Sequence, residues 1–139
     1  MIVAAQEEGL SVIQLMNDLD EMRESMRTDE AQVHYNMGTI FYHQGKHREA
    51  RDEFRKSVEL APNDANAHFN LAYVAGDYLH DFQTALDHYQ MYLYLEPNAQ
   101  DAPLVQEKIL DAQLNIRAWQ EKVVDHEVKD DNPREVYNW

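Results

Sequence analysis

Two stretches of this chain match each other at a nearly constant offset, and no other feature constrains the fold as strongly. The offset is 34 residues in the first matches and 35 in the later ones, so one residue is inserted between Ala75 and Ala85. The matching pairs are His34 and His68, Asn36 and Asn70, Met37 and Leu71, Gly38 and Ala72, Ala50 and Ala85, Phe54 and Tyr89, Leu60 and Leu95, and Pro62 and Pro97. This period is typical of a repeat built from two helices, which stacks on its neighbours to bury its apolar face.

Composition limits the classes of partner. The 139 residues are one domain's worth of chain, and their formal net charge is −14. An acidic protein is repelled by nucleic-acid backbones and by anionic membranes, so neither is predicted as a partner. A protein or peptide partner that is basic or apolar is favoured, because the field raises its encounter rate. The alternative is that the charge mainly maintains solubility. No apolar run approaches the roughly 20 residues of a membrane span.

Residues 1–30 are predicted to form an N-terminal amphipathic helix. Its apolar residues recur at spacings of 3, 4, 3 and 4, which places them on one helical face. They are Val12, Leu15, Leu19, Met22 and Met26. Because two heptads are too few for a free coiled coil, we expect this helix to pack against the first repeat. Self-association through this stripe is the alternative.

The two repeats are predicted to span residues 31–64 and 65–99. Breaks at glycine and proline divide them into helices over about 30–43, 47–60, 65–78 and 81–95. Gly45 separates the first pair of helices, and Pro62 and Pro97 close the repeats because proline cannot continue a helix. We expect the inserted residue to enlarge the hairpin turn of the second repeat.

The remaining residues are predicted to form a cap and a tail. Residues 100–120 resume the apolar helical spacing, with Asp101 as the expected N-cap and Pro103 in the first turn. A single helix here would be a C-terminal capping helix. Residues 121–139 lose that spacing and are rich in acidic residues, which predicts a mobile tail. Its last residues include Tyr137 and Trp139, which could dock on a groove of the same chain or of a second copy.

Residues 31–99 resemble the tetratricopeptide repeat family. With Ala31 as the first position, the repeats carry small residues at the eighth position, small residues at the twentieth, aromatic residues at the twenty-fourth and proline at the thirty-second. These are Gly38, Ala50, Phe54 and Pro62, and then Ala72, Ala85, Tyr89 and Pro97. The resemblance implies an all-α fold, a short right-handed solenoid of antiparallel helix hairpins. It also implies close approach of Gly38 to Ala50 and of Ala72 to Ala85.

Four residues depart from the family pattern. His34 and His68 stand where tryptophan is usual, and Ser57 and Tyr92 stand where alanine is usual. Tyr92 is too bulky for close packing against a standard third repeat, which fits the non-standard helix predicted after it.

In this family the first helix of each repeat lines a concave, peptide-binding groove. The resemblance therefore implies a groove lined by Gln32, Tyr35, Asn36, Thr39, Tyr42 and His43 in the first repeat, and by Asn66, Phe69, Asn70, Tyr73 and Asp77 in the second. Some members grip a terminal carboxylate with lysine and arginine, but the matching places here hold Tyr35, Thr39 and Asn70. That clamp is not predicted, although Lys108 of the cap could reach the groove. The aromatic side chains could instead pack against flanking helices.

The leading hypothesis is an adaptor or scaffold that binds a peptide or helix of another protein in this groove. The alternatives are a self-assembling structural protein and a chaperone similar to the small acidic tetratricopeptide chaperones of bacterial secretion systems. No catalytic, cofactor or metal site is predicted: cysteine is absent, and Gly45 interrupts the helix between His43 and His47. We expect a cytoplasmic location, with the periplasm open if a leader was removed.

Overall fold

The computed structural model describes residues 2–130, and the side chains of residues 11–124. The described residues form helices and turns and contain no strand, which confirms the all-α prediction. Their contacts group the chain into two compact units, Met1–Asn63 and Asp64–Trp139. Each unit holds one helix hairpin, and the right-handed stacking of the hairpins stays a prediction.

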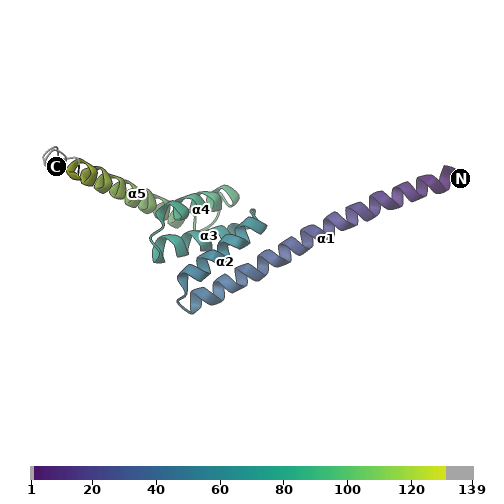
Figure 1. Ribbon diagram of the computed structural model, residues 1–139, viewed down its shortest axis with the longest axis horizontal. Helices are drawn as coiled ribbons and strands as arrows, with labels where there is room; N and C mark the ends of the chain where they lie inside the picture. Colours follow the sequence, from purple (N-terminus) through teal and green to yellow (C-terminus); the bar gives the residue numbers. More distant parts are fainter. Residues whose placement is uncertain (1, 131–139) are drawn as a thin grey trace, which may run out of the picture. The chain divides into compact units, whose positions relative to one another are not determined.

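The first unit is a hairpin of α1, Ile2–His43, and α2, His47–Leu60, which runs back along the C-terminal part of α1 (Figure 1). Ala31 of α1 and Ala50, Phe54 and Val58 of α2 are buried in this unit. Ser57 is also buried, and its hydroxyl donates a hydrogen bond to the Ala31 carbonyl oxygen at 3.0 Å. This bond explains how a hydroxyl is tolerated where the family usually has alanine, because a buried polar group needs a partner.

α1 corrects two predictions about the N-terminal segment. The expected boundary near residue 30 does not exist, because α1 continues without interruption for 42 residues. No glycine or proline occurs between Gly9 and Gly38 to break it, and the Thr28 hydroxyl bonds back to the Glu24 carbonyl within the helix. The predicted packing of the stripe against the first repeat is also wrong. The five stripe residues are between 51% and 68% exposed.

The connection between α1 and α2 is the one predicted at Gly45. This glycine has a φ of 76°, a left-handed conformation that favours glycine because a side chain would clash with the backbone. The amide of Lys46 donates to the Phe41 carbonyl at 2.9 Å, and the amide of Gly45 donates to the Tyr42 carbonyl at 3.0 Å. Together they form the paired hydrogen bonds of a Schellman C-cap.

The second unit contains α3, Ala65–Tyr73, which passes directly into a π-helical turn, Val74–Tyr78. It continues with α4, Phe82–Leu95, and α5, Ala102–Asp130. Asp64 caps α3, because its carboxylate accepts hydrogen bonds from the amides of Asn66 and Ala67. The core of this unit gathers side chains from α3, α4 and α5. Its buried members are Ala65, Ala72, Ala85, Tyr89, Tyr92 and Val105.

The inserted residue lies in the π-helical turn, so the predicted enlargement of the hairpin turn is wrong. Both connections, Gln44–Lys46 and Leu79–Asp81, are three residues long. In the second repeat the amide of Asp81 donates to the Ala75 carbonyl, six residues back, where its counterpart Lys46 reaches only five back. His80, the counterpart of Gly45, likewise has a positive φ of 55°. The helix has therefore widened, while the turn has kept its form.

Both hairpins have a close approach at a glycine, while the predicted approaches of Gly38 to Ala50 and of Ala72 to Ala85 stay predictions. A Cβ added to Gly38 would lie 2.7 Å from Cε1 of Phe54, and its nearest neighbours are all atoms of that ring, not of Ala50. In the second unit it is Gly76, inside the π-helical turn, that approaches Ala85, with a separation of 2.9 Å for an added Cβ. Ala72 is buried in the same core as Ala85.

α5 is longer than the predicted capping helix. It continues to Asp130, so residues 121–130 are helical and the predicted tail boundary at 121 is wrong. Residues 131–139, with the tail aromatics, lie outside the described residues. The N-terminal half of α5 packs on α4 through the buried Val105 and Ala112. The hydroxyl of Tyr92 donates a hydrogen bond to the Asp101 carboxylate at 2.7 Å, at the start of α5.

The bond between Tyr92 and Asp101 predicts an alkaline loss of stability. Chiefly this bond, and then burial, raises the pKa of Tyr92 from 10.0 to about 12. A raised pKa favours the neutral phenol in the fold, so the contribution is complete below pH 10 and is lost as the pH rises to about 12. We expect Tyr92→Phe to be less stable than wild type at neutral pH and to lose less stability over this interval. Urea unfolding across the interval measures this, with the exposed Tyr94→Phe as control; an equal alkaline loss in wild type and Tyr92→Phe would contradict it.

Candidate protein-binding faces

The first predicted binding face lies on the C-terminal part of α1. Tyr35 is half-buried, and its ring meets the Phe54 ring edge to face at a centroid distance of 5.8 Å. The Thr39 hydroxyl donates to the Tyr35 carbonyl oxygen at 3.1 Å, so this polar group is already engaged by the helix. Packing on Phe54 holds the Tyr35 ring in place while part of it stays open to solvent.

The other predicted residues of this face are more exposed. Gln32 and Asn36 are both exposed, and the Gln32 amide donates to Oδ1 of Asn36 at 2.9 Å. Tyr42 is half-buried, with its ring centroid 5.4 Å from that of the exposed His43 and 6.0 Å from that of His47. The face therefore offers two anchored aromatic rings with amide groups beside them.

Three apolar residues of α1 extend this face and were missed by the sequence analysis. Val33 and Ile40 are more than half exposed, and Met37 is 37% exposed. They follow one another at spacings of four and three residues, so they share one side of the helix. That spacing was the available signal, but it equally predicts a core stripe. Only the structure shows that these side chains face solvent.

The second predicted face lies on α3 and the π-helical turn. Asn66 is exposed in the first turn of α3, and Asn70 is half-buried. Phe69 contributes mainly to the core, because its ring meets those of Tyr89 and Tyr92 edge to face at 5.7 and 5.4 Å. The alternative that an aromatic residue of the groove packs internally therefore applies to Phe69.

Tyr73 and Asp77 meet a cation from α5. Lys108 Nζ lies 3.1 Å from Oδ2 of Asp77 and 5.1 Å from the centroid of the Tyr73 ring. Lys108 thus reaches two of the predicted residues, as the sequence analysis considered. The ring and the carboxylate both stabilise the ammonium group and hold it over this end of the face. Because the ion pair with Asp77 neutralises it, Lys108 is poorly placed to bind a peptide carboxylate.

A small cavity lies beside this ion pair. Its volume is about 60 Å³, and it is lined by Gly76, Asp77, Phe82, Ala85, Tyr89, Lys108, Asp111 and Ala112. The buried hydroxyl of Tyr89 has no hydrogen-bond partner among the described residues. Burial is the main cause that raises the pKa of this phenol, with smaller effects from Asp77 and Tyr73. The raised pKa keeps this hydroxyl in its neutral form.

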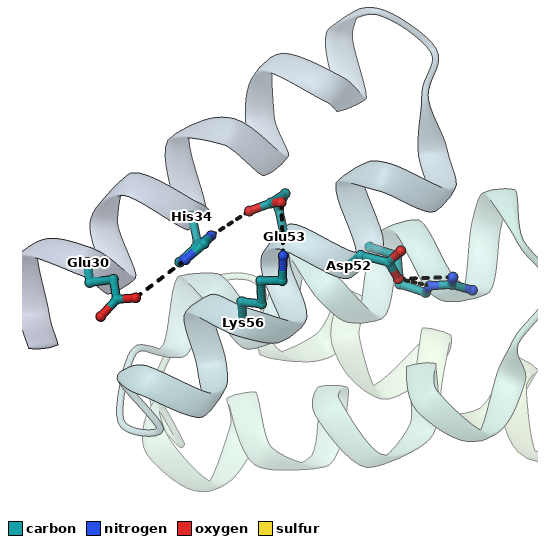
Figure 2. A network of polar contacts seen from close by, with 6 residues as sticks. Glu30, His34, Asp52, Glu53 and Lys56 are labelled. Atoms are coloured by element: carbon teal, nitrogen blue, oxygen red, sulfur yellow. Dashed lines mark hydrogen bonds and ion pairs between the residues drawn. The ribbon is translucent and has the colours of Figure 1, made fainter.

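A polar network joins the two helices of the first hairpin (Figure 2). Nδ1 of His34 donates to the Glu53 carboxylate at 2.5 Å, and Glu30 lies 3.9 Å from the other ring nitrogen. Lys56 Nζ lies 3.4 Å from the second oxygen of Glu53, while Arg51 and Asp52 form a separate pair at 3.0 Å. Glu53 is only 8% exposed, so His34 provides a buried carboxylate with a donor.

The second hairpin has an equivalent pair. His68 and His88 take the places of His34 and Glu53, and their Nδ1 atoms lie 2.8 Å apart in a hydrogen bond between stacked rings. A histidine at the place of the family's tryptophan is therefore bonded to the second helix of its own hairpin in both repeats. The repeat offset relates His34 to His68 and Glu53 to His88, but it does not show which residues pair across a hairpin, and the sequence analysis did not consider Glu53 or His88.

A larger hollow lies between the start of α4 and α5. Its volume is about 650 Å³, and Phe82, Ile116 and Trp119 are the apolar residues in its lining. Trp119 is 68% exposed. The sequence analysis did not predict this hollow, which makes it a competing surface for a partner.

Two further findings concern metals and membranes. Among the residues with described positions, no three histidine, aspartate or glutamate side chains are grouped as ligands for a metal ion. Across the same part of the chain, no helix combines the length and apolar character that crossing a bilayer requires.

Comparison with known proteins identifies the repeats. Residues 29–93 match the model of one family, the Tetratricopeptide repeat. The match covers the C-terminal part of α1, all of α2 and α3, and nearly all of α4. A comparison with curated proteins gave no match.

Proposed function

Since the chain is a tetratricopeptide repeat protein, whose repeats mediate protein–protein interactions, we propose that it is an adaptor for a peptide or helix of a partner protein. The partner would contact the exposed parts of the first helices, α1 over residues 32–43 and α3 with its π-helical turn. As part of the same proposal, we expect that the chain is not an enzyme.

The observation that carries this proposal is the partial burial of two tyrosines on these helices. Tyr35 and Tyr73 are half-buried, so each ring is held by its neighbours but keeps an open part. Phe54 holds Tyr35, and Lys108 lies over the ring of Tyr73. Tyrosine rings that their neighbours already hold in place lose little conformational entropy on binding. Tyrosine is also among the most frequent interface hot spots.

The polar groups around these rings suit a peptide. Asn36 is exposed and Asn70 half-buried, and an asparagine side chain can hydrogen-bond to the backbone of a bound chain. The net charge of −14 favours a basic or apolar peptide over an acidic one. The neutralised Lys108 supports the expectation that a carboxylate clamp is not used.

Peptide selection followed by substitution tests the proposal. A random peptide library displayed on phage is panned against the full chain, and the selected peptides are synthesised for affinity measurements. We expect Tyr35→Ala and Tyr73→Ala each to weaken binding by about 30-fold, which corresponds to about 2 kcal/mol for a hot spot. Circular dichroism should show unchanged helicity, because neither ring is fully buried.

Tyr94→Ala is the matched control. Tyr94 lies on α4, outside the first helices, and is 80% exposed, so its removal should leave the affinity unchanged. For a basic peptide, affinity for wild type should also fall as the salt concentration rises. Equal binding by wild type, Tyr35→Ala and Tyr73→Ala would show that the partner uses another surface, such as the hollow beside Trp119.

A further inference from the structure

The exposed stripe of α1 leads to an inference that goes beyond the adaptor function. We infer that residues 12–26 pair with the same segment of a second copy, as a parallel, in-register, two-stranded coiled coil. The stripe consists of Val12, Leu15, Leu19, Met22 and Met26, all more than half exposed. A contiguous apolar surface of this kind on a soluble protein marks an interaction site.

The spacing of the stripe fits a second helix. Steps of 3, 4, 3 and 4 residues place Val12, Leu19 and Met26 at position a of a heptad, and Leu15 and Met22 at position d. The next d position holds Asp29, so the apolar seam ends there. One helix lying along these a and d positions covers them.

The structure removes the objection that two heptads are too short. A short isolated coiled coil must first nucleate its helices, which is the unfavourable step of helix formation. Here the seam belongs to α1, which is continuous with the hairpin that it forms with α2. The helix therefore extends from a folded base, and the energy of association does not have to nucleate it.

Charge complementarity identifies the occupant as a second copy and sets its direction. Asp18 and Arg23 flank the seam at positions g and e, five residues apart, and both side chains are exposed. In a parallel, in-register pair, g of one helix faces the following e of the other, so Asp18 of each copy faces Arg23 of the other. In an antiparallel pair g faces g and e faces e, so this attraction is absent. The segment is thus complementary to itself about a two-fold axis.

Sedimentation equilibrium of the full chain tests the pairing. Wild type should have twice the 16.3 kDa mass of the chain, and Leu19→Glu should return it to 16.3 kDa. Leu19 is exposed in the hairpin, so this variant should keep its helicity and its melting transition in the monomeric state. Ile13→Glu is the matched control. Ile13 is equally exposed on α1 but lies off the seam, so this variant should stay dimeric.

A charge exchange tests the direction. Asp18→Arg and Arg23→Asp should each weaken the dimer several-fold, because each places like charges opposite each other twice. The double variant should restore the wild-type dissociation constant. A wild-type mass of 16.3 kDa at every concentration would overturn the inference and leave the stripe to a different protein. Equal dissociation of the Leu19→Glu and Ile13→Glu dimers would also overturn it. So would a double variant that dimerises no more tightly than the single variants. Peptide binding by Leu19→Glu should be unchanged, which separates this inference from the adaptor function.

Discussion

Gly38→Leu is expected to lower the melting temperature by about 5–10 °C, from an overpacking cost of about 2 kcal/mol. Even the first added atom, a Cβ, would lie 2.7 Å from the Phe54 ring, which is closer than carbon atoms can approach. Phe54 is only 2% exposed, so the ring cannot turn aside into solvent. The two helices would have to separate, with loss of contacts along the hairpin. Thermal unfolding followed by circular dichroism measures the effect.

A pair of alanine variants separates packing from helix propensity. Alanine is favoured over glycine inside a helix by about 1 kcal/mol, so propensity alone predicts that both Gly9→Ala and Gly38→Ala stabilise the protein. An added Cβ at Gly9 meets nothing within 4 Å, whereas at Gly38 it meets the Phe54 ring. We expect Gly9→Ala to stabilise and Gly38→Ala to destabilise. Stabilisation by both would contradict the close approach at Gly38.

His34→Ala is the second substitution with a large expected effect. It removes the nitrogen that donates to Glu53, which is 8% exposed and whose carboxylate keeps only the weaker contact with Lys56 at 3.4 Å among the described residues. Leaving one partner of a buried pair without the other is strongly destabilising, so we expect a loss of about 3 kcal/mol in the free energy of unfolding. Urea denaturation measures this loss.

Two further variants make this prediction specific. Glu30→Ala removes only the exposed partner at 3.9 Å and should cost less than about 1 kcal/mol. The double variant His34→Leu/Glu53→Leu replaces the buried pair with apolar side chains and should recover most of the stability lost in His34→Ala. A double variant as unstable as the single one would mean that shape, not an unpaired carboxylate, causes the loss.

Local signals predicted the elements that end at glycine or proline. α2 spans His47–Leu60 as predicted, because Gly45 and Pro62 mark its two ends. The end of α1 at His43 was predicted for the same reason. The boundary near residue 30 was wrong because nothing in that segment breaks a helix. In α1 the helix continues beyond the hairpin although no core of the described residues covers its stripe.

The inserted residue shows the limit of the repeat pattern. The change of offset from 34 to 35 located it, but a hairpin turn and a helix can each accept one extra residue. The structure places it in the π-helical turn, where Gly76 allows the widened backbone to approach Ala85. Whether the extra residue has the lower energy in the turn or in the helix depends on packing between the two helices. The sequence of either helix alone does not determine this packing.

The binding faces were predictable only in part. The family pattern named positions on the first helices, and the structure shows which of those side chains are open and which, like Phe69, support the core. The pairs His34–Glu53 and His68–His88 were missed because they join two helices and have no local signature. The exposure of the stripe was missed because an apolar face usually predicts packing within the chain.

Photo-crosslinking to a selected peptide tests the central claim, binding through the first helices, most directly. A photoreactive phenylalanine is placed singly at Tyr35, Tyr73, Tyr94 or Trp119, and the crosslinked peptide is detected by mass spectrometry. The account predicts crosslinks from Tyr35, Tyr73 or both, and none from Tyr94 on α4 or Trp119 on α5. Crosslinks from Trp119 without any from Tyr35 or Tyr73 would contradict it and assign binding to the hollow between α4 and α5.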